Sequence, residues 1–62
     1  MNTEKILDLL KTKEVDIKLM KSPMVRSAAD YNTFFKRKHC FTDNNALTNI
    51  EYAMIISWLR SN

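Results

Sequence analysis

The chain has 62 residues, a length that allows one small domain whose core only just offsets the entropy lost on folding. Hydrophobic residues make up 45% and charged residues 27%, the balance of a globular domain and not of a disordered chain. The formal net charge of +3 is modest, and one cysteine with one histidine cannot build an internal disulfide or a zinc site within one chain.

The residue types favour helices over sheets. The chain has no glycine and one proline, so it lacks the residue that two-residue hairpin turns most need for a positive backbone φ. We therefore expect an all-α fold, a small bundle of three or four helices. The lone thiol fits a reducing compartment, and the start of the chain lacks the apolar stretch of a secretory signal. No run approaches the roughly 20 apolar residues of a membrane span, so we expect a cytoplasmic protein that does not enter the membrane.

The first predicted helix covers residues 3–13. Its apolar side chains recur at spacings of one, three and four residues, which places them on one face of a helix. These side chains are Ile6, Leu7, Leu9 and Leu10. Asn2 or Thr3 is the expected N-cap, because a side-chain oxygen there accepts a hydrogen bond from an unpaired backbone N–H.

Residues 14–21 give a mixed signal. Apolar and polar side chains alternate over residues 15–19, which is the period of a half-buried strand. No second alternating run is present to pair with this segment, and a lone strand is not stable. We expect a short helix or an extended connector.

A longer helix is predicted over residues 23–38. Serine is a good N-cap and proline is tolerated at the first helical position, so Ser22 and Pro23 mark its start. The expected buried stripe consists of Met24, Ala28, Tyr31 and Phe35, widened by Val25, Ala29 and Phe34. The cations that end this helix suit the negative end of its dipole.

The last predicted helix covers residues 49–60 and has the clearest start. Residues 42–45 have the composition of a turn. Thr48 and Glu51 fit a capping box, in which each side chain accepts a hydrogen bond from the backbone N–H of the other residue. Leu47 and Tyr52 fit a hydrophobic staple across the first turn.

The last helix is also the main candidate for binding a partner. Its apolar residues occupy nearly the whole circumference and leave Glu51, Ser57 and Arg60 as the polar positions. Such a helix needs cover on more than one side, which leaves apolar surface for a partner to cover. The predicted partner-binding residues are Tyr52, Ile55, Ile56, Trp58 and Leu59. The alternative is that all of them belong to the core.

No arrangement of residues predicts an active site, a metal site or a cofactor. His39 and Cys40 pair a base with a nucleophile, but neighbours in sequence project in different directions. We interpret them as a surface histidine and a half-buried thiol. The acids are scattered, and residues 43–45 lack the glycine and glutamate of a calcium loop. Without glycine, a phosphate-binding loop is also excluded, so we do not expect an enzyme.

A basic run suggests nucleic acid as an alternative partner. In nucleic-acid sites, cations hold the phosphates and neighbouring aromatic side chains stack on the bases. The candidate nucleic-acid contacts are Arg26, Lys36, Arg37 and Lys38, and the aromatic neighbours of the run are Phe34, Phe35 and Phe41. Residues 15–36 resemble a helix-turn-helix reader, which implies that the second helix faces a DNA groove. The small residue or glycine usual in the turn of that family is absent.

The pattern as a whole favours a small non-enzymatic regulator or inhibitor that binds another macromolecule, most simply a protein. Short chains rich in lysine and asparagine suggest a phage or mobile-element accessory protein by analogy of composition. Two alternatives stay open: a DNA-binding regulator of the helix-turn-helix type, and a structural homodimer whose last helices pack together.

Overall fold

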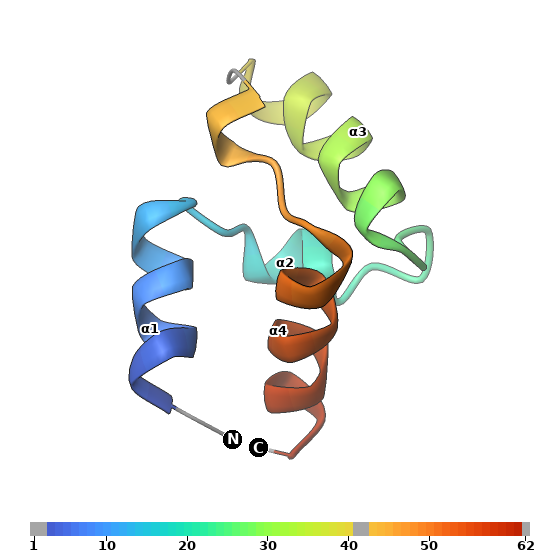
Figure 1. The fold of residues 1–62 in the computed structure, drawn as a ribbon. Coiled ribbons are helices and arrows are strands. Elements are labelled where there is room, and N and C mark those ends of the chain that lie inside the picture. Colours follow the sequence, from blue (N-terminus) through green and yellow to red (C-terminus); the bar gives the residue numbers. More distant parts are fainter. Residues whose placement is uncertain (1–2, 41–42, 62) are drawn as a thin grey trace.

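The computed structural model describes residues 3–40 and 43–61, and this part of the chain is all-α, as predicted (Figure 1). Its elements are α1 (Thr3–Thr12), α2 (Ile17–Met20), α3 (Ala28–His39), the 3-10 turn η1 (Asp43–Asn45) and α4 (Asn49–Ser61). Helix α4 contacts both α1 and α3, and α2 packs against α3. The start of α1 and the end of α4 lie at the same end of the molecule. None of the helices in the described ranges has the length and apolar run needed to cross a bilayer.

One hydrophobic core joins the four helices and the two connectors that contain Val25 and Leu47. Its buried residues are Ile6, Leu9, Met20, Val25, Ala28, Tyr31, Phe35, Leu47 and Ile55. Ile6, Tyr31 and Ile55 are fully buried, and the rings of Tyr31 and Phe35 pack with their centroids 5.4 Å apart. Since each helix contributes at least one of these residues, no helix is held by its own propensity alone.

Helix α1 follows the prediction closely. Thr3 is its first helical residue and is therefore not its N-cap, and the other proposed cap, Asn2, lies outside the described residues. The helix closes through a hydrogen bond from the Val15 N–H to the Leu10 carbonyl (3.0 Å), with Glu14 at a positive φ of 49°. This is the Schellman pattern that normally uses glycine. The segment that follows forms the short helix α2, so the connector alternative for residues 14–21 is not needed.

The predicted start of the third helix at Pro23 is wrong, because α3 begins at Ala28. Ser22 forms a turn instead, and its carbonyl accepts from the Val25 N–H (3.0 Å). The true N-cap is Ser27, whose Oγ accepts from the Asp30 N–H (3.2 Å), while Asp30 Oδ2 accepts from the Arg26 N–H (3.1 Å). This reciprocal pair satisfies two backbone amides that have no intrahelical partner at the amino end of α3.

The later start changes which side chains are buried. Met24 is 66% exposed and Ala29 is also exposed, so the prediction that they belong to the buried stripe is wrong. Val25 is buried from the connector, and Ala28, Tyr31 and Phe35 are buried from α3 as predicted. A turn breaks the helical spacing before Ala28, and Val25 turns inward in place of Met24.

The capping box at the start of α4 is confirmed. The Thr48 N–H donates to Glu51 Oε1 (2.9 Å), and the Glu51 N–H donates to Thr48 Oγ1 (3.1 Å). Leu47 just before the cap is buried, and the Asn32 side chain holds its backbone from α3. Asn32 Nδ2 donates to the Leu47 carbonyl (3.0 Å), and the Leu47 N–H donates to Asn32 Oδ1 (2.9 Å). The long connector is therefore tied to α3 directly before α4 begins.

Candidate functional site

An open groove of about 940 Å³ lies between α4 and the connector that joins α2 to α3. Seven residues between Tyr52 and Ser61 line the α4 wall, and six between Met20 and Arg26 line the connector wall. Its volume is at the upper end of the roughly 300–1,000 Å³ usual for ligand sites. We call this site the groove.

Helical spacing places three apolar side chains of α4 on the groove. Tyr52, Ile56 and Leu59 follow one another at steps of four and three residues, which puts them on one side of the helix. All three are partly buried against the core and keep part of their surface toward the groove. Three of the five predicted partner-binding residues are therefore brought together.

The other two predicted partner-binding residues do not line the groove. Ile55 is fully buried, because it lies at the centre of the α4 face that packs on the core, so no partner can reach it. Trp58 lies three residues beyond Ile55 and on the other flank from Ile56; it is partly buried and does not line the groove. The inclusion of Ile55 in a binding surface is therefore wrong.

The connector wall depends on the turn at Ser22 and Pro23. Because no helix starts there, the chain stays beside α4 until Arg26, and Val25 is buried in the core. The Tyr52 hydroxyl lies 3.5 Å from the Val25 carbonyl oxygen, a long contact that joins the two walls. This wall was not predicted from the sequence, since a helix from Pro23 onward has no such connector.

The charges of the groove are all positive. Lys21 and Arg26 stand on the connector wall and Arg60 on α4, and all three are exposed, with no acid among the lining residues. In the part of the chain that the structure describes, the ion pairs of Asp16 with Lys38 and His39 do not involve these cations. The Asp30 carboxylate accepts from the backbone N–H of Arg26. The groove thus combines an apolar wall with unneutralised cations on both sides.

The basic run lies elsewhere, at the end of α3. Lys36, Arg37 and Lys38 are exposed there. The Arg37 guanidinium lies 5.9 Å from the centre of the Phe34 ring, and Lys38 Nζ lies 2.8 Å from Asp16 Oδ2. Arg26 lies before the start of α3 at Ala28, and about 12 Å of helical rise separates that start from Lys36, the first residue of the run.

The aromatic part of the nucleic-acid hypothesis is weakened by burial. Phe35 is in the core and cannot stack on a base. Phe34 is partly buried, and Phe41 lies outside the described residues. The resemblance to a helix-turn-helix also lacks its geometry, because α2 has four residues and a connector of residues 21–27 follows it, whereas the motif uses a turn of three or four residues.

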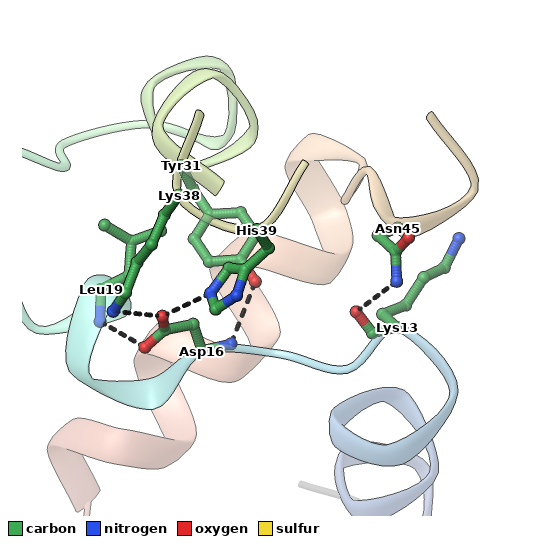
Figure 2. Close-up of polar contacts among 7 residues, drawn as sticks. All are labelled: Lys13, Asp16, Leu19, Tyr31, Lys38, His39 and Asn45. Carbon is green, nitrogen blue, oxygen red and sulfur yellow. Dashed lines mark hydrogen bonds and ion pairs between the residues drawn. The ribbon is translucent and has the colours of Figure 1, made fainter. Parts of the chain in front are cut away.

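A polar cluster around Asp16, which we call the Asp16 cluster, was not predicted (Figure 2). Asp16 Oδ1 accepts from the Leu19 N–H (2.9 Å) and caps α2, while Oδ2 lies 2.8 Å from both Lys38 Nζ and His39 Nε2. The Asp16 N–H donates to the Tyr31 hydroxyl (3.2 Å). One side chain thus fastens α2 to the carboxyl end of α3.

Electrostatics explain the ionisation of this cluster. Burial raises the pKa of Asp16, but the hydrogen bonds from Lys38, the Leu19 N–H and His39 outweigh it, so the pKa lies far below its usual 3.8. Burial also raises the pKa of the Tyr31 hydroxyl, so this residue stays a neutral hydrogen-bond partner. The carboxylate remains charged and paired at all moderate pH values.

The neighbouring residues His39 and Cys40 have different surroundings. His39 is partly buried against Asp16 and Phe35, and Cys40 is exposed with a left-handed backbone (φ 57°) as the C-cap of α3. The expectations of a surface histidine and a half-buried thiol were therefore wrong. His39 is the more buried of the two because it contacts Asp16, which lies 23 residues away in sequence. Among the described residues, no three His, Cys, Asp or Glu side chains gather as a metal site.

No protein-family model matches this chain, and no curated protein sequence or solved structure matches it either.

Proposed function

We propose that this chain is a non-enzymatic binding protein that docks another protein in the groove and acts on it as a regulator or inhibitor. The observation that carries the proposal is the row of Tyr52, Ile56 and Leu59, half covered by their own chain along one wall of a concave surface. Apolar area left in water costs about 25 cal/mol per Å². A partner that covers these side chains gains that free energy, and the concave shape defines where it lies.

The basic run at the end of α3 fits nucleic acid poorly, which favours a protein partner in the groove. Nucleic-acid sites combine cations with exposed aromatic faces or a helix that enters a groove of the duplex. Here Phe35 is buried, and Lys38 already pairs with Asp16. The exposed thiol of Cys40 favours a reducing compartment, which supports the further proposal of a cytoplasmic site of action.

The test is a comparative pull-down from nuclease-treated cell lysate. Bait proteins are the wild type, Ile56→Asp in the groove and Ile50→Asp on the same helix. Ile50 is a matched control because it is 73% exposed and does not line the groove. The wild type and Ile50→Asp should retain one dominant protein, and Ile56→Asp should lose it.

A second groove variant guards against a folding defect. Ala53 lines the groove and is exposed, so Ala53→Glu obstructs docking without disturbing the core. Circular dichroism checks the helix content of each bait. The proposal is overturned if both groove variants retain the partner, if capture disappears with nuclease treatment, or if the captured protein is only a second copy of this chain.

A further inference from the structure

We infer that the occupant of the groove is an acidic amphipathic helix of a partner protein, with apolar anchors on one face and carboxylates beside them. This inference rests on the proposed function and specifies its partner. It follows from the shape of the groove, the spacing of its apolar wall and the sign of its charges.

The shape of the groove favours a helix among the usual peptide modes. Strand addition needs an exposed sheet edge, and the described part of the chain contains no strand. Proline-rich segments dock on several aromatic rings, whereas Tyr52 is the only aromatic residue among those lining the groove. An apolar row with a facing connector is the surface that accepts the apolar face of a helix.

The spacing of the wall matches a helix that lies along α4. Tyr52 and Leu59 are seven residues apart on one helix, which corresponds to a rise of about 10.5 Å. A second helix beside α4 repeats its own apolar positions with the same rise, at i, i+4 and i+7. Three anchors of the partner therefore meet Tyr52, Ile56 and Leu59 together.

The positive charges of the groove favour a partner with negative charge. Lys21 and Arg26 lie on one wall and Arg60 on the other, with no acid among the lining residues. A helix seated between these walls brings both of its flanks near cations. Carboxylates there gain ion pairs and faster association, and lysines there are repelled.

The same features argue against two other occupants. A second copy brings another cationic groove and a net charge of +3, which adds repulsion. A flat anionic membrane reaches protruding side chains better than the floor of a groove, and the most exposed large apolar residues, Leu7, Met24 and Ile50, are not among the groove residues.

A displayed library of helical peptides tests the inference with the full chain as bait. Each peptide carries leucine at i, i+4 and i+7, and its flanking positions vary freely among glutamate, lysine, glutamine and serine. Enriched peptides are then titrated into ¹⁵N-labelled protein, so that amide shifts identify the site. We expect enrichment of glutamate and shifts at Tyr52, Ala53 and Ile56.

Charge-matched variants separate specific pairing from general attraction. Arg26→Gln with Arg60→Gln should weaken the selected peptide about fivefold, the loss expected from two exposed ion pairs. Lys36→Gln with Arg37→Gln removes the same charge outside the groove and should leave the affinity within about twofold. Equal loss in both double variants would overturn the acidic pairing.

The outcomes distinguish this inference from the proposed function. Groove binders enriched in lysine or in neutral residues overturn the acidic partner and leave docking in the groove intact. Selection of no peptide that shifts groove amides contradicts both proposals. Phosphatidylglycerol vesicles that shift the same amides more strongly than the selected peptide replace the protein helix with a lipid surface, and a dimeric mass at high concentration that blocks the peptide replaces it with a second copy.

Discussion

Substitution of Asp16 separates two functions of one side chain. Asp16→Asn keeps a good N-cap for α2 and removes the negative charge that faces Lys38 and His39, whereas Asp16→Ala removes both. The carboxylate is 11% exposed, so its loss is felt more strongly than that of a surface acid. Asp8→Asn is the matched control, because Asp8 is an exposed acid on α1.

The expected magnitudes follow from the contacts. Loss of an N-cap costs about 1 kcal/mol. Lys38 is 53% exposed and His39 is 31% exposed, so solvent screens both pairs and together they contribute about 1 kcal/mol. Asp16→Asn should thus lower the free energy of unfolding by about 1 kcal/mol and Asp16→Ala by about 2, or roughly 4–8 °C in Tm for each kcal/mol. Asp8→Asn should stay within about 0.5 kcal/mol of the wild type.

The pH dependence supplies a second readout. The pKa of Asp16 in the folded protein lies below its ordinary value of 3.8, so the unfolded chain binds the proton more readily. The stabilisation is therefore fully present above about pH 5 and is lost as the pH falls through the ordinary pKa toward the folded one. Urea unfolding followed by circular dichroism from pH 5 to pH 2 should show the gap between wild type and Asp16→Asn closing in acid. A gap that is absent at pH 5, or that does not shrink by pH 2, would refute this reasoning.

Two further predictions concern the ends of α3. Ser27→Ala should lower the free energy of unfolding by about 1 kcal/mol, because Ser27 is the N-cap. Ser22→Ala should lower it by less than half as much. Equal losses of stability in thermal unfolding would contradict the start of α3 at Ala28. Cys40 holds a φ of 57°, a conformation that costs a non-glycine residue about 1 kcal/mol, so Cys40→Gly should raise Tm slightly despite the greater freedom of glycine in the unfolded chain. Since both variants lack the thiol, a lower Tm for Cys40→Gly than for Cys40→Ala would contradict this backbone explanation.

The ends of α1 and α4 could be predicted from sequence because their signals are local. The capping box of Thr48 and Glu51 lies within four residues, and the apolar spacing of α1 is visible in one window. The start of α3 could not be decided in this way, since Ser22 and Ser27 are both competent caps. In the structure Val25 is buried from the connector while Met24 is exposed, an arrangement that depends on packing against the rest of the chain and not on a local pattern.

The candidate site could be predicted only in part, because its local signals are visible in the sequence and its packing is not. The surplus of apolar residues on α4 identified Tyr52, Ile56 and Leu59, but helical spacing alone did not say which residue of the helix faces the core. Ile55 takes that place because α1 and α3 both contact α4. The Asp16 cluster joins residues 22 and 23 positions apart, and no local pattern connects a helix cap to the end of a later helix.

The proposed partner also bears on the stability of the fold. A chain of this length has a small core, and the partly covered side chains of α4 contribute less to that core than buried ones do. A ligand present at 100 times its Kd raises the free energy of unfolding by about 2.7 kcal/mol. This exceeds the loss of about 2 kcal/mol expected for Asp16→Ala. A partner in the groove would cover Tyr52, Ile56 and Leu59 and hold residues 20–26 against α4, so its binding and the folding of this region would be thermodynamically linked. Binding of a partner in the groove should therefore raise the Tm of Asp16→Ala by as much as it raises that of the wild type. The groove and the Asp16 cluster share no residues, so their effects on stability should add.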